Sequence, residues 1–277
     1  ADSYATVAPL PQRTGRNGRA FGDVSAGVAG VVGGLAIGAG LAATRDTWSG
    51  PGGLMTSLGT IAALAGTYLC LVALMLAARM PWLEREVGQD RLVAWHRKVG
   101  PWALVLVTAH FALTSLGYAQ AADVSIWDEV VTLVTSYPWM MPAAAAMGIM
   151  VMLGIVSIPS VRQRMAYETW WAGHLYFYLA IALAFGHQLT SGSLFSSHDV
   201  LRYLWVALYI TVAATIVWSR LALPVVRSVR HDLRVDRVVR EADGLISIYL
   251  SGRNLAQLNA RGGQFFAWRF LTRNWWW

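Results

Sequence analysis

The chain has 277 residues, of which 56% are hydrophobic and only 13% are charged. A soluble domain carries about a quarter charged residues, so the long uncharged runs place this chain among multi-pass membrane proteins. The net charge of +7 reflects arginines that gather on one side of membrane segments, which makes nucleic-acid binding the poorer interpretation. The single cysteine, Cys70, lies inside an apolar run, which excludes a disulfide framework and a thiolate metal site.

Six apolar stretches, each long enough to cross a bilayer, follow a polar leader at residues 1–22. We expect them at about 24–44, 54–78, 95–118, 139–158, 169–189 and 201–223. They predict an all-α transmembrane domain of six helices at residues 23–225. The chain starts at Ala1 without a methionine and has no signal-peptide pattern, so we expect both ends to be edges of a longer protein.

Lysine and arginine residues are distributed unequally around these spans. If the N-terminus lies inside, ten of them flank the inner ends of the spans, whereas only Arg45 and Arg202 lie outside. The C-terminal region adds ten more to the inner side. Because positive charge concentrates on the cytoplasmic side, we expect both termini in the cytoplasm and lipid around the spans.

Residues 226–277 have a different pattern. Short β-rich runs flank a turn at 242–244, and hydrophobic residues alternate from 246 to 250. The segment GGQFFAWRF at 262–270 predicts a third strand after a double glycine. Because three strands cannot close a barrel, we expect the opening of an incomplete β-domain here.

Four histidines lie inside the predicted spans. His96 and His110 are 14 residues apart in the third span, and His174 and His187 are 13 apart in the fifth. A helix rises about 1.5 Å per residue, so each pair covers about 20 Å of a hydrocarbon layer about 30 Å thick. Ionisable side chains are rare at this depth and usually mark function. Two helices that each offer an imidazole at two levels are typical of a protein that holds two stacked hemes.

The two spans also predict which histidines share an iron. They run in the same direction, because one span separates them, so His96 and His174 are expected to hold an inner heme. His110 and His187 then hold an outer heme, with two axial ligands for each iron. The C-x-x-C-H signature of covalent heme is absent, which predicts b-type heme. On an ideal helix, two side chains 13 residues apart point about 140° away from each other around the helix axis. The fifth span must therefore bend, tilt or change its winding, or the hemes attach around different sides of it.

Heme propionates are anionic and need cationic partners. Arg97 and Lys98 directly follow the inner ligand His96, and Arg45 lies on the outer side. These three residues are candidate propionate contacts, and ordinary interfacial charges are the alternative.

This pattern resembles the ferric reductase-like transmembrane domain shared by NADPH oxidases, yeast-type ferric reductases and bacterial relatives. The resemblance rests on the 14- and 13-residue histidine spacings in the third and fifth of six spans. The segment GGQFFAWRFLTRNWWW is also similar to the first part of a ferredoxin-reductase-type FAD-binding barrel. Together these features cover roughly residues 54–277.

The resemblance implies a bacterial plasma-membrane oxidoreductase in which cytoplasmic NADPH or NADH reduces FAD. Single electrons then pass to the inner heme, to the outer heme and to an acceptor outside, such as ferric iron or oxygen. Residues 226–277 would begin the FAD-binding domain, and no flavin-binding residue is assigned. Oxidases of the family carry a further outer histidine where this chain has Thr114, which weakens a dedicated superoxide function.

Three other functions fit the same histidines. A cytochrome b-like subunit that oxidises quinol also ligates two hemes from two helices. A heme-binding membrane anchor would pass electrons to a partner enzyme, and a transporter would use the histidines to relay protons. The terminal acceptor, a partner protein and a homo-oligomer all stay open.

Overall fold

The computed structural model describes residues 27, 30–35, 37–42, 44–191, 194–195 and 198–258. The chain forms two compact units, one within residues 17–219 and one whose described part begins at Arg220. The expected polar leader at 1–22 and the expected third strand at 262–270 lie outside the described residues.

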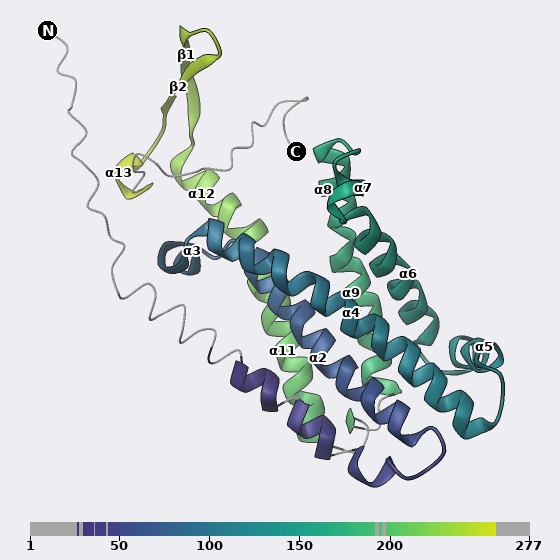
Figure 1. The fold of residues 1–277 in the computed structure, drawn as a ribbon. Helices are drawn as coiled ribbons and strands as arrows, with labels where there is room; N and C mark the ends of the chain where they lie inside the picture. Colours follow the sequence, from purple (N-terminus) through teal and green to yellow (C-terminus); the bar gives the residue numbers. More distant parts are fainter. Residues whose placement is uncertain are drawn as a thin grey trace, which may run out of the picture. The chain divides into compact units, whose positions relative to one another are not determined.

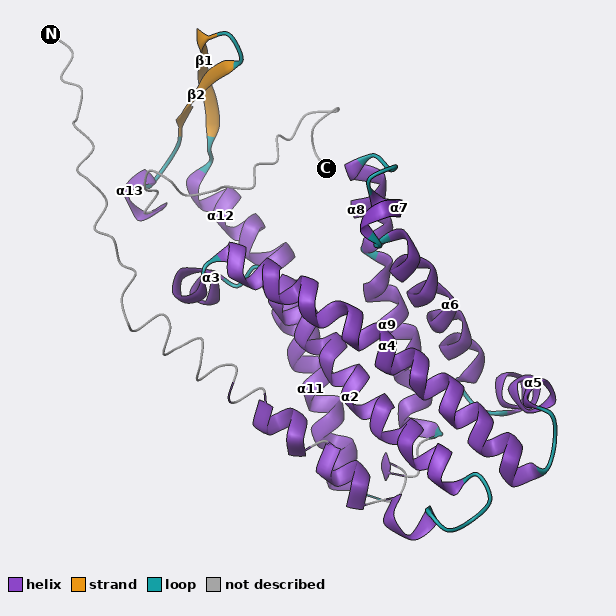
Figure 2. Ribbon diagram, viewed as in Figure 1, coloured by secondary structure: helices purple, strands orange, loops and turns teal. Residues whose placement is uncertain are grey.

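The first unit is a bundle of helices that run up and down roughly alongside one another (Figures 1 and 2). Its long helices are α2 (Gly53–Ala77), α4 (Gln89–Ala122), α6 (Met140–Val156), α9 (Tyr176–Thr190) and α11 (Asp199–Val217). The short helices are η1 (Arg45–Thr47), α3 (Pro81–Val87), α5 (Ile126–Ser136), α7 (Pro159–Arg162) and α8 (Tyr167–His174). Helix α2 packs along α4, α6 packs along α9, and α11 packs against α2.

Three helical runs are long and apolar enough to cross a membrane, namely Gly53–Ala77, Gln89–Ala122 and Asp199–His231. Helices α5 and α6 add a fourth span only if they count as one broken span, because they meet at 118°. The described residues therefore confirm a mostly helical, multi-pass membrane protein, but they do not show the six spans that hydropathy predicts.

The remaining predicted spans differ from long continuous helices for local reasons. The stretch expected at 24–44 lies partly outside the described residues, which contain a shorter apolar helix at Gly30–Ala42. Helix α6 has 17 residues and begins only at Met140, because Trp139 before it has a φ of 62°, which a right-handed helix cannot contain. The stretch expected at 169–189 is divided at Leu175 into α8 and α9.

The interior of the bundle is apolar, and so is much of its exterior. Leu71, Met150, Ile181 and Val212 form a buried cluster to which α2, α6, α9 and α11 each contribute. Large apolar side chains also point away from the bundle, among them Trp102, Val105, Met141, Met152, Tyr203, Leu204 and Ile210. An exposed apolar surface of this extent is stable only in an apolar solvent, so these side chains face lipid.

Helices α2 and α4 approach each other closely, because glycines stand at their contact. A Cβ atom on Gly66 would lie 2.9 Å from the backbone nitrogen of Val107. A Cβ atom on Gly117 would lie 2.7 Å from the nitrogen of Thr56 and 2.8 Å from the oxygen of Gly52. Small residues at helix contacts let backbones pack tightly in membranes, where the hydrophobic effect does not drive helix association.

The second unit contains a β-hairpin. Its elements are α12 (Leu223–His231), β1 (Arg234–Ala242), β2 (Leu245–Ser251) and α13 (Leu255–Leu258), and the π-helix η2 (Trp218–Ala222) precedes them. Strands β1 and β2 pair antiparallel around a turn in which Gly244 has a φ of 79°. Arg237 lies opposite Tyr249 and places its guanidinium 4.1 Å from the ring centroid. The predicted turn and the two strands beside it are confirmed, whereas a two-stranded sheet does not show a barrel.

Candidate metal centre

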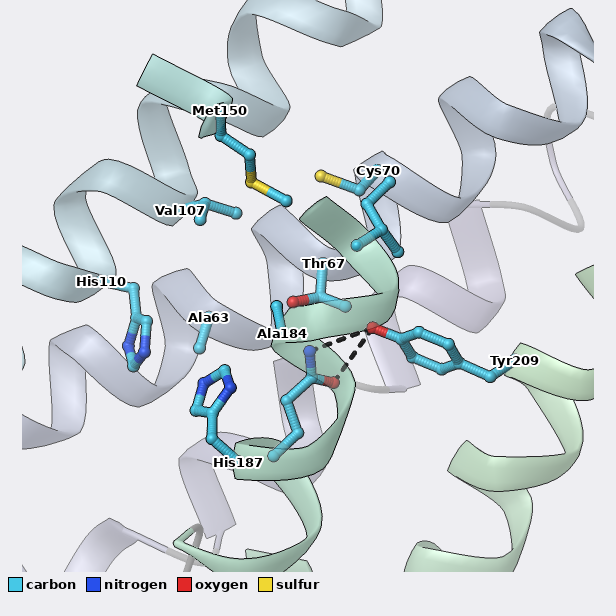
Figure 3. Close-up of a pocket in the computed structure, with 11 residues that line it drawn as sticks. Ala63, Thr67, Cys70, Val107, His110, Met150, Ala184, His187 and Tyr209 are labelled. Carbon is cyan, nitrogen blue, oxygen red and sulfur yellow. Dashed lines mark hydrogen bonds between the residues drawn. The ribbon is translucent and has the colours of Figure 1, made fainter. Parts of the chain in front are cut away.

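The four membrane histidines come together in two pairs. His96 on α4 faces His174 at the end of α8, with ring centroids 6.1 Å apart and ring planes at 74°. His110 on α4 faces His187 on α9, with ring centroids 6.4 Å apart and ring planes at 25°. Figure 3 shows the His110 and His187 side chains extending toward each other from their helices. These are the two pairs expected for ligand-bearing helices that run in the same direction.

The helices that carry the two sets of histidines belong to different packed pairs. Helix α4 packs along α2 and helix α9 along α6, whereas the α4 and α9 backbones come close at isolated points at most. The imidazoles therefore lie in the space between α4 and α9. This arrangement leaves the imidazoles facing each other across the interior of the bundle.

The ring separations match a metal held between two imidazoles. A metal–nitrogen bond to histidine is about 2 Å long and the nitrogen lies about 1 Å from the ring centre, so two axial imidazoles have centroids about 6 Å apart. Both pairs meet this distance. Within the described part of the chain, no group of three or more His, Cys, Asp or Glu side chains is placed to hold a metal ion. A pair of histidines suits an iron whose other four ligands come from a porphyrin.

The helical winding is interrupted between His174 and His187. Helix α8 ends at His174, and the N–H of Leu175 lies 3.3 Å from both the Trp171 and the Ala172 carbonyl oxygens. Helix α9 then begins at Tyr176. The segment that carries the two ligands is therefore not one regular helix, in keeping with the 13-residue spacing.

Backbone carbonyls of α2 contact both histidines of α4. His96 Nδ1 lies 3.0 Å from the Ala73 oxygen, and His110 Nδ1 lies 3.0 Å from the Gly59 oxygen. A carbonyl oxygen can only accept, so each Nδ1 carries the proton and donates it. Each Nε2 then keeps a lone pair for a metal, the arrangement commonly found when histidine ligates a metal.

His174 and His187 are held by weaker hydrogen bonds than His96 and His110. His174 Nδ1 lies 3.5 Å from the Ser157 hydroxyl, and His187 Nδ1 is buried with no partner among the described residues beyond the Ala184 carbonyl of its own helix. The donor set therefore fits two six-coordinate hemes, each with one firmly oriented ligand from α4 and one less constrained ligand from α8 or α9.

Aromatic rings surround the inner ligand His174. Trp170, one helical turn earlier, stacks on its imidazole at 4.9 Å, and Phe177 meets it edge-on at 5.1 Å. The guanidinium of Arg162 lies 4.3 Å from the centroid of the Trp170 ring. Sequence reasoning missed this contact, although the four-residue spacing of Trp170 and His174 puts both on one helix face.

The outer pair borders a mostly apolar cavity, drawn in Figure 3. Beside this cavity, the oxygen of Gln188 accepts hydrogen bonds from Trp205 Nε1 at 2.8 Å and from the Tyr209 hydroxyl at 3.2 Å. These bonds join α9 to α11 at the residue that follows His187. Because the network satisfies both buried donors, it restricts rotation of α9 about its axis next to the ligand. Sequence reasoning missed this network.

The three candidate propionate contacts lie at the surface of the protein. Arg45, Arg97 and Lys98 are exposed, and none of them forms an ion pair among the described residues. Their role toward a propionate stays a prediction.

A comparison with known protein families bears directly on this site. Residues 62–185 match the ferric reductase like transmembrane component family. The matched segment contains His96, His110 and His174, and it ends two residues before His187. Comparisons with curated proteins and with solved structures gave no match. A ferric reductase-like transmembrane domain in a chain with membrane-spanning helices indicates a membrane oxidoreductase.

Proposed function

We propose that this chain is the membrane part of an oxidoreductase that carries electrons from cytoplasmic NAD(P)H, through FAD and two b-type hemes, to an acceptor on the outer side. The observation that supports this function most strongly is the pair of facing imidazoles at each of two levels, 6.1 Å and 6.4 Å apart. Bound there, each heme would take up and release one electron.

The two levels suit transport across a bilayer. His96 and His110 are separated by 14 residues of one continuous helix, which is about 21 Å along its axis. That distance covers most of a hydrocarbon layer of about 30 Å. Two redox groups at these levels would shorten each electron transfer, compared with one transfer across the whole membrane.

The protein's own residues hold and shield these groups. His96 and His174 would bind the inner heme, and His110 and His187 the outer heme. The α2 carbonyls orient the α4 imidazoles, and the Gln188 network restrains α9. Trp170 and Phe177 pack against His174 and would shield the inner site.

The direction of electron flow follows from the distribution of positive charge. Arg97 and Lys98 lie next to the inner ligand His96, and this end of the bundle is assigned to the cytoplasm by the excess of Lys and Arg. Cysteine at Lys98 should therefore react with an impermeant thiol reagent only from the cytoplasmic side. Labelling from the outside would reverse the assignment.

FAD and the nicotinamide donor are proposed from the family resemblance. The β1–β2 hairpin follows the helical unit in the chain, as the start of a flavin-binding domain would. The acceptor is ferric iron, oxygen or a similar small oxidant. The presence of Thr114 in place of a further outer histidine favours a reductase over a dedicated oxidase.

Electron transfer across a sealed membrane tests this function. We expect liposomes that contain the chain with bound heme and are loaded with ferricyanide to consume it when dithionite is added outside, because neither reagent crosses the bilayer. The His96→Ala/His110→Ala double variant should reduce ferricyanide no faster than protein-free liposomes. Gly148→Ala, which changes a lipid-facing glycine with no atom within 4 Å of the new Cβ, should match the unaltered chain. Equal rates for the double variant and the unaltered chain would contradict the proposal.

A further inference from the structure

Helices α2 and α4 share one antiparallel register along their contact. Ala73 meets His96, Gly59 meets His110, and Gly52 lies against Gly117. In every pair the two residue numbers add to 169, so each contact lies seven or fourteen residues from the next on both helices. A seven-residue repeat keeps one face of a helix against its neighbour, as in a coiled coil.

This register explains the 14-residue spacing of the α4 ligands. Two heptads separate His96 from His110, and two heptads separate the carbonyls of Ala73 and Gly59 that they contact. Both imidazoles therefore meet α2 in the same way at two levels, with the same Nδ1–oxygen distance of 3.0 Å. A spacing that did not follow the heptad would turn one of the two rings away from α2.

Gly59 lets this contact form at the outer level. A Cβ atom there would lie 3.0 Å from both the backbone nitrogen and the Cγ2 atom of Thr114, and 3.4 Å from the carbonyl oxygen of His110. Most of these atoms belong to the α4 backbone, which cannot rotate away as a side chain would. Any side chain at position 59 would therefore push α2 from α4 and lengthen the His110–Gly59 hydrogen bond.

The hydrogen bond has a chemical consequence for a bound metal. Donation of the Nδ1 proton to a carbonyl makes the imidazole a more basic ligand and fixes which nitrogen faces the metal. A stronger donor ligand stabilises the oxidised iron and so lowers its reduction potential. Within the membrane no water competes for the carbonyl, so the bond persists. Among the described residues, His187, opposite His110, has no such carbonyl partner on a neighbouring helix.

We propose that α2 is the positioning element of both redox sites. The carbonyls of Ala73 and Gly59 fix the tautomer and ring orientation of His96 and His110 and lower the reduction potentials of the two hemes. Gly59 is the positioning residue of the outer site, because its missing side chain brings the carbonyl within reach. This inference rests on the proposed function, since it concerns hemes held by these histidines.

Two changes to the outer contact test the proposal in the heme-loaded chain. Gly59→Ala moves the carbonyl away from His110, with Gly148→Ala as the matched control. Nδ-methylhistidine at position 110 removes the donated proton and leaves Nε2 free to bind iron. The measurements are the heme-to-protein ratio, the midpoint potential of each heme, and the electron paramagnetic resonance spectrum of the oxidised hemes.

Both changes should act on one heme only. We expect the outer heme to shift to a higher midpoint potential with altered resonance positions, or to be lost, while the inner heme keeps its potential. Gly148→Ala should leave both hemes unchanged. An unaltered outer heme in the two test variants, or equal changes in both hemes, would overturn the proposal. If the unaltered chain binds no heme, the proposed function itself fails, which is a separate result.

Discussion

Replacing either outer histidine, by His110→Ala or His187→Ala, is expected to lower the heme content from two hemes per chain to one. The two side chains face each other at 6.4 Å, so each variant leaves the same iron with a single axial ligand. The inner pair His96 and His174 is untouched in both variants, so its heme should remain. His96→Ala and His174→Ala should remove the inner heme in the same way.

The ratio of heme to protein and the potential of the remaining heme distinguish these variants. His198→Ala is the control, because His198 lies outside both pairs and its Nδ1 contacts the Leu194 carbonyl at 3.3 Å. It should keep both hemes. The pairing would be wrong if His96→Ala and His187→Ala lost one and the same heme while the other two variants lost the second.

Gly117→Ala is expected to lower the thermal stability of the bundle, although alanine favours helices. Its Cβ would lie 2.7 Å from the nitrogen of Thr56 and 2.8 Å from the oxygen of Gly52. Both are backbone atoms, one in the first turn of α2 and one in the residue that precedes it, so the start of α2 must shift away from α4. Overpacking of this kind costs about 1–3 kcal/mol, which exceeds the gain of about 1 kcal/mol in helix propensity.

The midpoint of thermal unfolding in detergent measures this cost. Gly148→Ala is again the matched control, because its Cβ meets no atom within 4 Å and should leave the midpoint unchanged or raise it. A midpoint for Gly117→Ala at or above that of Gly148→Ala would show that α2 and α4 do not pack as described.

The long helices followed from hydropathy, whereas the short and broken ones did not. The stretch predicted at 54–78 is α2 at Gly53–Ala77. An uninterrupted apolar run forms a helix in lipid, because a helix satisfies all of its backbone hydrogen bonds internally. Helix α4 is longer than predicted, at Gln89–Ala122, since it continues into polar residues that hydropathy excludes. No proline marks the break at Leu175, and Gly173, two residues earlier, lies inside α8.

Helix α5 was missed, although a local signal was present. Ser125 caps its first turn by accepting a hydrogen bond from the Asp128 nitrogen at 3.2 Å, while its hydroxyl donates to the Asp128 carboxylate at 2.7 Å. A serine followed three residues later by an acidic residue is a known start signal for a helix. A search for long apolar stretches does not detect α5, because the helix has only eleven residues and two acidic residues in its first turn.

The four histidines of the candidate site could be selected from the sequence, whereas the backbone carbonyls that contact His96 and His110 could not. Histidine in an apolar run is a strong signal because it is rare there. The carbonyls of Ala73 and Gly59 carry no such signal, since every residue has a carbonyl. The seven-residue spacing of small residues at 52, 59, 66 and 73 is visible in the sequence. Only the structure shows that these residues lie at the contact of α2 with α4.

The most direct test of the central claim is the reduced-minus-oxidised absorption spectrum of the purified, heme-supplied chain, together with its heme-to-protein ratio. The paired imidazoles predict b-type bands and two hemes per chain, both of them low-spin because each iron has two histidine ligands. A well-folded chain that shows no b-type bands, or that binds heme without low-spin character, would contradict the account.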